Sequence, residues 1–435
     1  MSRVKLLPTI VKRANDAAQS VKRCMNQAVT YVREKTLTKL LDLPYFEVDG
    51  YAIEADGEQE ILHLYCHVTI EAAVCPLCKC IAIEVKERKE RCIRDIDCLG
   101  KRTFVHFAIR RFECAECGHR FTEELQAVAW RRHQSIRFEE AVYQRCLQSS
   151  KSAVATALQL HYSTVDTIFK HYAKRQAKGC AQMHVRILGI DEIALKKRHK
   201  QYVLVLSDLQ RRCVIAVLPS REQAALKAWF DTLSPQQQQA IRVVSMDMWR
   251  PYRSFVEQSL PKARIVADRF HVMKQLNEQL SKARRQIQRS ADAQTKAALK
   301  GCRWLLVHNR SDLSDDQQLQ LQLALQADDM LRSAYLLKEE FRLIFEKIHD
   351  REQARRFLQA WMLKVRFTGN TYLLDFLNTL VNWFEPILNY FDQRITNGFV
   401  EGTNRAIRFL ISRAFGFRNF DNFRLLVLAQ LGPPV

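Results

Sequence analysis

The sequence predicts a multidomain α/β protein in which small N-terminal modules precede a larger domain with a mixed β-sheet. The chain has 435 residues, which is more than one hydrophobic core usually organises. The residue pattern changes along the chain. Short alternating runs with paired cysteines come first, a basic helical stretch follows, and apolar strands separated by helices come after it. Hydrophobic residues make up 47% and charged residues 26%, as in ordinary globular proteins, so we expect most of the chain to fold.

Charge and hydropathy narrow the class of partner. Lys and Arg number 68 against 47 Asp and Glu, which gives a net charge of +21 and a pI near 9.6. A balance this basic favours a nucleic-acid partner, although a merely basic protein is the alternative. The chain has no apolar run long enough for a bilayer, and Lys5, Lys12 and Arg13 occupy the N-terminus without an apolar signal core. We therefore expect a cytoplasmic protein that has no membrane partner.

Residues 1–45 form the first predicted segment, which is helical and basic and ends before Pro44. Residues 46–130 form the second, a zinc-finger domain. Its alternating runs at 61–68 and 103–107 predict short β-hairpins.

Two C-x-x-C pairs lie in this second segment, separated by residues 79–113, and they consist of Cys75, Cys78, Cys114 and Cys117. Paired thiolates at this spacing suit a tetrahedral structural Zn²⁺ that stabilises a domain with a small core. Reduced cysteines packed in a small core are the alternative. An exchanged ligand also stays open, because four further candidates lie close in sequence: Cys80, Cys92, Cys98 and His119.

Residues 134–177 predict a helix-turn-helix domain, because polar breaks at 149–150 and 161–163 divide the segment into three short helices. Ser163 is expected to cap the third helix, with Val165, Ile168 and Phe169 packed inward. Short polar side chains at a helix start reach base edges, and basic ones contact phosphates. The candidate DNA-binding residues are Thr164, Thr167, Lys170, Lys174 and Arg175. Any three-helix packing unit would have a similar pattern.

Residues 185–272 predict five strands, at 185–191, 202–206, 213–218, 241–246 and 263–267. A helix is expected at 222–233, before the fourth strand, and a second helix-like segment, which Pro251 could start, lies between the fourth and fifth strands. Three consecutive strands followed by strand, helix and strand is the order of an RNase H-like mixed sheet. Residues 273–395 predict an all-helical insertion, because no proline lies between Pro261 and Pro386. Residues 396–435 are expected to return the chain to the sheet.

Three acidic residues stand where the predicted elements could bring them together. Asp191 and Asp247 close the first and fourth strands, and Glu401 shares a helix face with Asn404, Arg405 and Arg408. Carboxylates suit Mg²⁺ or Mn²⁺, and two such ions can activate a nucleophile and stabilise the leaving oxygen of a phosphodiester. Asn404 and Arg408 are predicted to support the site, and Arg405 is a further candidate contact to the DNA backbone. Taken singly, each acid is more readily explained as a strand-end or surface residue.

Asp268 competes with Asp247 for the second metal-binding position, because both follow apolar runs. In an RNase H-like sheet the fourth strand lies beside the first and the fifth lies one strand further out, at about 4.8 Å per strand. Asp247 is therefore predicted as the metal ligand. Asp268 and His271 are predicted to support the site.

At these residues, from about position 70 onward, the chain resembles the ISL3 family of bacterial transposases. The motifs that carry the resemblance are Cys75–Cys78, Arg111–Gly118, Gly189–Lys197, Met246–Trp249, Asp268–Val272 and Val400–Asn404. The resemblance implies a zinc finger, a helix-turn-helix and an RNase H-like DDE domain split by a helical insertion. It also implies that Asp191, Asp247 and Glu401 are the catalytic acids. Lys79 and Arg198 depart from the family pattern, in which glycine is common at both positions.

The expected function is that of a DDE transposase, which binds the terminal inverted repeats of an insertion sequence and catalyses metal-dependent cleavage and strand transfer. Its expected partners are terminal-repeat and target DNA and at least one further copy of the chain, because two ends must be held together. A catalytically silent DNA-binding regulator and an RNase H-like structure-specific nuclease are the alternatives. Trp304, beside Arg303, is expected in a helical core, with stacking on an unpaired base as the alternative.

Overall fold

The computed structural model describes residues 30–31, 35–57, 59–129, 132–196, 201–394, 398–414, 416–417 and 419–434. The chain divides into two compact units, Met1–Tyr172 and Ala173–Val435. Most of the predicted helical segment 1–45 lies outside the described residues, as do Lys197, Arg198 and His199. Within that segment the structure describes the short strand β1 (Thr30–Tyr31) and the helix α2 (Lys35–Leu41).

The first unit is built on a twisted sheet whose strands follow the order β1-β2-β3-β7-β6, with β8 beside β7. Alternate side chains of the strands, among them Leu62, Leu64, Val105 and Phe107, form a buried core on one face. The bounds are β2 (Phe46–Asp56), β3 (Gln59–Val68), β6 (Glu84–Cys98), β7 (Lys101–Glu113) and β8 (Arg120–Thr122). A separate two-stranded sheet, β4 (Ala73–Val74) with β5 (Ile81–Ala82), carries the first cysteine pair. The runs predicted as strands at 61–68 and 103–107 lie within β3 and β7, which are 10 and 13 residues long.

Three helices follow, as the polar breaks predict: α3 (Ile136–Gln148), α4 (Lys151–Leu158) and α5 (Tyr162–Ala181). Ser135 and Ser150 cap the first two, each accepting a hydrogen bond from a backbone N–H three residues later. The predicted cap at Ser163 is wrong, because α5 begins at Tyr162 and Ser163 lies in its first turn.

The second unit contains a mixed sheet with strand order β11-β10-β9-β12-β13. Its strands are β9 (Ile187–Lys196), β10 (Gln201–Asp208), β11 (Cys213–Leu218), β12 (Val243–Met246) and β13 (Arg264–Ala267). The first three pair antiparallel, and β12 and β13 run parallel to β9. The predicted neighbours are confirmed, because β12 lies directly beside β9 and β13 lies one strand further out.

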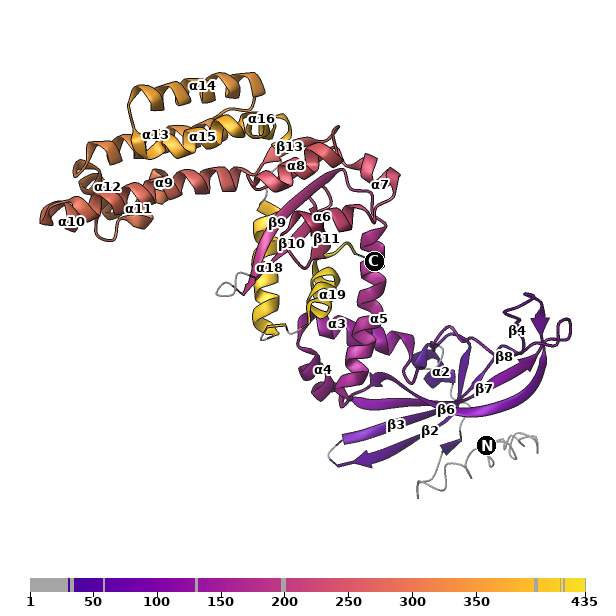
Figure 1. Ribbon diagram of the computed structural model, residues 1–435. Helices are drawn as coiled ribbons and strands as arrows, with labels where there is room; N and C mark the ends of the chain where they lie inside the picture. The colour runs from indigo at the N-terminus through magenta and orange to yellow at the C-terminus, as the bar shows by residue number, and fades with distance from the viewer. Residues whose placement is uncertain are drawn as a thin grey trace. The chain divides into compact units, whose positions relative to one another are not determined.

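Helices cover both faces of this sheet (Figure 1). On one face Ile190 and Leu204 pack in the same core as Leu226 of α6 (Gln223–Phe230) and Phe255 of α8 (Arg250–Ser259). On the other face Ile193 and Val203 pack with α18 (Gly398–Arg413) and α19 (Phe420–Leu431). The short helix α7 (Pro235–Ala240) leads into β12. The C-terminal residues thus return to the sheet, as the sequence predicts.

Every element that the structure describes between β13 and α18 is helical. These elements are α9 (Arg269–Ser290), α10 (Ala293–Leu299), α11 (Arg303–Val307), η2 (Arg310–Asp312), α12 (Asp315–Gln326), α13 (Asp329–Lys347), α14 (Arg351–Phe367), η3 (Thr371–Leu373), α15 (Leu374–Asn382), α16 (Phe384–Leu388) and α17 (Tyr390–Gln393). Phe341, Trp361 and Phe376 form an aromatic cluster in their core, with ring centroids 4.8–5.9 Å apart. None of the helices described here is long and apolar enough to cross a membrane.

Candidate functional site

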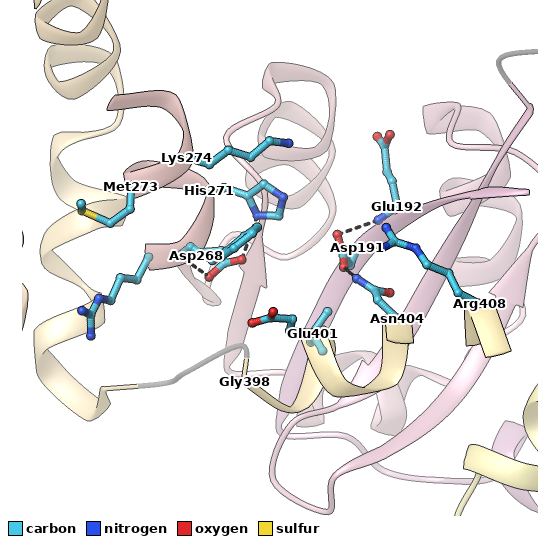
Figure 2. A pocket seen from close by; sticks show the side chains of 13 residues that line it. Asp191, Glu192, Asp268, His271, Met273, Lys274, Gly398, Glu401, Asn404 and Arg408 are labelled. Carbon is cyan, nitrogen blue, oxygen red and sulfur yellow. Dashed lines mark hydrogen bonds and ion pairs between the residues drawn. The ribbon is translucent and has the colours of Figure 1, made fainter. Parts of the chain in front are cut away.

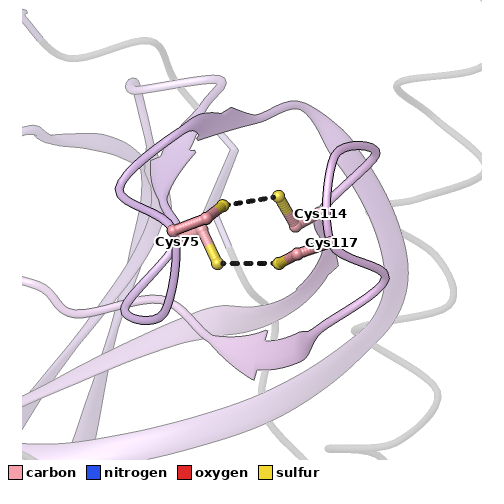
Figure 3. Close-up of side chains that lie close together, drawn as sticks. Cys75, Cys114 and Cys117 are labelled. Atoms are coloured by element: carbon pink, nitrogen blue, oxygen red, sulfur yellow. Dashed lines mark hydrogen bonds between the residues drawn. The ribbon is translucent and has the colours of Figure 1, made fainter.

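The two cysteine pairs converge at one end of the first unit (Figure 3). The four sulfur atoms all lie within 4.8 Å of one another, and they belong to Cys75, Cys78, Cys114 and Cys117. The closest approaches are 3.4 Å between Cys78 and Cys114 and 3.7 Å between Cys75 and Cys117. Four thiols at these separations suit a closed tetrahedral Zn²⁺ site, so the cluster supports structural zinc. Across the described residues, no other group of three or more potential metal ligands is found, and the four alternative ligands lie outside the cluster.

Local backbone geometry prepares the first pair for metal binding. Burial alone would raise the pKa of the Cys75 thiol, but backbone N–H groups of Cys78 and Leu77, together with neighbouring thiols, lower it to about 7. In the same cluster a backbone hydrogen bond from His119 would lower the pKa of Cys117, but burial and the other three thiols outweigh it and raise that pKa to about 12. The thiolate, which is the form that binds zinc, is therefore favoured at Cys75 and disfavoured at Cys117. The turn places Lys79 at φ +65° and the matching Gly118 at φ +65°. Lys79 therefore holds a left-handed conformation that favours glycine, which explains why glycine is common at that position in the resembled family.

A cavity of about 460 Å³ opens in the second unit, at the edge of the mixed sheet (Figure 2). It collects residues from three separate parts of the chain, namely β9, the start of α9, and α18. The lining residues are Asp191, Glu192, Asp268, Arg269, Phe270, His271, Met273, Lys274, Gly398, Val400, Glu401, Asn404 and Arg408. Two of the three predicted catalytic acids and all four predicted supporting residues are in this set.

Asp191 forms the buried side of the cavity and is 7% exposed. One carboxylate oxygen accepts a hydrogen bond from the backbone N–H of Glu192 at 2.8 Å, and the other accepts one from the side-chain amide of Asn404. Burial raises the pKa of Asp191, although these two hydrogen bonds oppose the shift. The prediction that Asp191 ends its strand is wrong, because β9 continues to Lys196 in its pairing with β10. The parallel pairing with β12, however, stops one residue before Asp191, at Ile190.

Asp247 follows β12 directly and stands level with Asp191, since Met246 and Ile190 are register partners. It does not line the cavity itself, but Asp247 Oδ2 lies 3.8 Å from Nε2 of the cavity residue His271. Asp268 does line the cavity, and both of its oxygens are already engaged. Oδ1 accepts the backbone N–H of Phe270 at 3.0 Å as the cap of α9, and Oδ2 accepts Nδ1–H of His271 at 2.8 Å.

His271 lies among these acids as a bridge between Asp247 and Asp268. Burial alone would lower its pKa, but the hydrogen bond to Asp268 and the charges of Asp247 and Asp191 raise it. The imidazole is thus held by Asp268 on one side and directed toward Asp247 on the other. The supporting role of the Asp268–His271 pair stays a prediction.

Helix α18 supplies the third acid. Glu401 and Arg408 are exposed, and Asn404 between them is partly buried, so one face of α18 borders the cavity. Arg405 is exposed but is not among the lining residues. Asn397, which precedes the Val400–Asn404 motif, lies outside the described residues.

Sequence reasoning missed four cavity residues that carry polar or aromatic side chains, Glu192, Arg269, Phe270 and Lys274, and the apolar Met273. Lys274 lies three residues after His271, so helical periodicity alone could have identified it. Glu192 accepts a hydrogen bond from the Tyr252 hydroxyl at 2.9 Å, which connects β9 to α8.

In the first unit and along α5, the predicted inward positions Val165, Ile168 and Phe169 are at most 2% exposed. Thr167, Lys174 and Arg175 are exposed, and Thr164 and Lys170 are partly so. Lys170 Nζ forms an ion pair with Asp166 at 2.7 Å, and Lys151 also pairs with Asp166. Thr167 donates its hydroxyl hydrogen to the carbonyl of Ser163 at 2.7 Å. Lys174 and Arg175 are therefore the more accessible cations of the predicted set.

Trp304 is 62% exposed, so its assignment to the helical core is wrong. The guanidinium of Arg303 lies 5.2 Å from its ring. Trp304 does not line the cavity, and stacking on a base stays a prediction.

Comparison with known proteins accounts for these features together. A family model described as "Transposase", for the ISL3 DDE domain, matches residues 188–427. Models described as "Helix-turn-helix domain of transposase family ISL3" and "zinc-finger of transposase IS204/IS1001/IS1096/IS1165" match residues 118–173 and 71–117. The helix-turn-helix match therefore begins earlier than the predicted 134.

Transposases of two different insertion sequence elements are similar to this chain over most of its length. The transposase for insertion sequence element IS1001 of Bordetella parapertussis is 29% identical over 391 residues, covering 87% of this chain and 95% of the relative. The transposase for insertion sequence element IS1557 of Mycobacterium tuberculosis (strain ATCC 25618 / H37Rv) is 28% identical, covering 70% and 74%. Since the DDE-domain match spans more than half of the 435 residues and all three family modules occur in order, the chain belongs to the ISL3 family of transposases.

Proposed function

We propose that this transposase cuts and rejoins the ends of an insertion sequence at the cavity of the second unit, with Asp191, Asp247 and Glu401 as ligands of two Mg²⁺ or Mn²⁺ ions. The observation that carries the proposal is the meeting of Asp191 from β9 with Glu401 and Asn404 from α18. These segments are more than 200 residues apart in sequence, and Asn404 is hydrogen-bonded to Asp191.

The sheet supports an RNase H-like assignment. Its order β11-β10-β9-β12-β13, antiparallel in the first three strands and parallel in the last two, is the order expected of that fold. On this assignment the helices from α9 to α17 are an insertion between the fifth strand and the helix that carries Glu401. The insertion separates Glu401 from Asp191 in sequence, but both residues line the same cavity.

Two observations favour Asp247 over Asp268 as the second metal ligand. Asp247 follows the strand directly beside β9, whereas Asp268 follows the next strand out. Asp268 already uses one oxygen to cap α9 and the other to orient His271. A ligand that gave up these bonds would leave the helix start and the imidazole unsupported.

Carboxylates are the ligands that hard divalent ions prefer. Asp191 and Glu401 line the cavity, and Asp247 lies beside its lining residue His271, so the three acids are less closely gathered than the four thiols of the zinc site. Two bound ions would activate the attacking water or 3′-hydroxyl and stabilise the leaving oxygen. Asn404 fixes the orientation of Asp191, and Asp268 fixes that of His271. Arg408 and Lys274 place positive charge at the cavity, where they can hold the phosphates of the bound strand.

DNA-end recognition is assigned to the first unit and α5. Thr164 and Thr167 lie near the start of α5, where side chains can reach base edges, and Lys174 and Arg175 are exposed further along it. Arg405 is proposed to contact the backbone beside the cavity. The partners are terminal-repeat and target DNA, and a dimer or higher oligomer would hold two ends together.

Cleavage of labelled duplexes tests the proposal against a silent regulator and a structure-specific nuclease. With Mg²⁺, the full chain should cut a duplex that carries the element's terminal repeat and leave an unrelated duplex intact. Asp191→Asn should bind the repeat without cutting it. Binding without cleavage by the unmodified chain would favour the regulator. Equal cutting of unrelated branched or flapped DNA would favour the nuclease.

A further inference from the structure

Phe270 is an exposed aromatic residue in the wall of the cavity. Its side chain is 54% exposed, although it stands between the buried Asp268 and the partly buried His271. The apolar positions of α9 that pack inward are Val272, Leu276, Leu280, Ala283 and Ile287. Phe270 lies off this stripe, so packing of the helix does not explain a large apolar side chain there.

The backbone of Phe270 is anchored, and its ring contacts a neighbouring ring. The backbone N–H of Phe270 donates to Oδ1 of Asp268, which fixes the first turn of α9. The Phe270 and His271 rings stand edge to face, with centroids 5.5 Å apart and an interplanar angle of 84°. The exposed part of the Phe270 ring is open to a flat partner.

The size and charge of the cavity indicate what that partner is. A volume of about 460 Å³ is within the range of small-molecule pockets, so it suits one nucleotide and is too small for a duplex. Lys274 and Arg408 offer cations for a phosphate, while Asp191 and Glu401 lie in the same cavity. A nucleotide that enters must leave its base stack, and an exposed aromatic ring can replace the lost stacking.

We propose that Phe270 stacks on an unpaired base beside the scissile phosphate, so that the cavity takes a single displaced nucleotide of the DNA end. The inference rests on the proposed function of the cavity as the cleavage site. Stacking on Phe270 would offset the free energy needed to unpair the DNA end. Loss of the Phe270 ring should therefore slow cleavage most when the end is fully paired.

The test compares Phe270→Ala, Phe270→Trp and the unmodified full-length chain on two terminal-repeat duplexes. One duplex is fully paired, and the other has mismatches at the nucleotides that flank the cut. Phe270→Ala should slow cleavage of the paired end by about five- to a hundredfold, the range expected from one stacking contact. The mismatched end should restore most of that loss, and Phe270→Trp should cut both ends well.

A fluorescent 2-aminopurine beside the cut gives an independent readout with Ca²⁺ in place of Mg²⁺. Its emission should rise on binding of the unmodified chain and not on binding of Phe270→Ala. Phe367→Ala is the matched control, because Phe367 is 95% exposed in α14 and does not line the cavity.

Equal losses on paired and mismatched ends, or no loss on either, would overturn the inference and leave the proposed function standing. Failure of the unmodified chain to cut either end would instead contradict the proposed function. Thermal unfolding of each variant separates these results from misfolding.

Discussion

The side-chain amide of Asn404 donates a hydrogen bond to Asp191 and so ties α18 to β9 across 213 positions of sequence. In the part of the chain that the structure describes, the amide oxygen of Asn404 is buried without a hydrogen-bond partner. Asn404 thus links the two acids Asp191 and Glu401: it donates a hydrogen bond to Asp191, and it lies on the same helix as Glu401.

Asn404→Ala should lower metal-dependent cleavage by about 10- to 100-fold, because it removes the group that orients a proposed metal ligand. The loss should be smaller at high Mg²⁺ concentration, since weaker metal binding is its cause. Cleavage rates across a Mg²⁺ titration measure this. Asn309→Ala, in an exposed hydrogen bond to Asp312, is the control and should cut normally. A loss of the same size at every Mg²⁺ concentration would contradict the orienting role.

Asp247→Asn should abolish cleavage and leave binding of DNA ends intact, because it removes a carboxylate at the proposed metal site. Asp268→Asn should retain residual cleavage, reduced by about 10- to 100-fold, because it disturbs only the support of His271 and the cap of α9. Cleavage and gel-shift assays on both folded variants check the ranking. The reverse ranking would transfer the metal-binding role to Asp268.

Purified reduced protein should contain about one zinc per chain, since four thiols form one closed site. Cys75→Ser and Cys114→Ser should each lose the metal, whereas Cys92→Ser, outside the cluster, should keep it. Elemental analysis of the three variants decides the matter. Full zinc content in Cys75→Ser together with loss in Cys92→Ser would show that a different set of ligands holds the ion.

Removing one exposed cation of α5 should weaken binding to all duplexes alike. Lys174→Ala should reduce the slope of log affinity against log salt by about one, because one phosphate contact is lost. Thr164→Val should instead reduce discrimination between terminal-repeat and unrelated duplexes, by about 1–3 kcal/mol if Thr164 reads a base edge. Lys170→Ala should have a smaller effect than Lys174→Ala, because Lys170 is already paired with Asp166. Unchanged discrimination in Thr164→Val would remove that residue from the recognition surface.

The first unit should lose stability in mild acid through His106. Burial, with a contribution from the neighbouring His63, lowers the pKa of His106 to about 4, below the ordinary value of 6.5. Between these values the unfolded chain binds the proton more readily, so stability falls as pH drops from about 6.5 to about 4, by up to about 3 kcal/mol. Denaturant unfolding of His106→Phe and of the unmodified chain at pH 7 and pH 5 measures this. An equal loss in both proteins would exclude His106 as the cause.

The strands and their order are predictable from sequence, because each is an apolar run bounded by polar residues and the mixed order follows from few alternatives. The extension of β9 beyond Asp191 is not. The charged pair Asp191 and Glu192 interrupts the apolar run in the middle of the strand, and Glu192–Lys196 are paired on one side only, with β10, so the first apolar run does not mark the strand's true end.

The acids are predictable as candidates because they follow apolar runs or share a helix face, but their surroundings depend on tertiary structure. The engagement of both Asp268 oxygens and the entry of Phe270 and Lys274 into the cavity follow from how α9 meets the sheet. Trp304 was expected in the core but is exposed. Amphipathic helices leave some large apolar residues in solvent, and the amino-acid composition of a helical segment does not show which ones.

Glu401 lies far downstream of Asp191 in the chain, so the ribosome makes these two acids at different times. The N-terminal zinc module and the helices that follow it emerge from the ribosome first and can fold first. A nascent chain then holds its DNA-recognition elements and Asp191 before α18 exists to supply Glu401 and Asn404. A nascent chain at this stage can hold DNA through its helix-turn-helix while the proposed metal site still lacks Glu401.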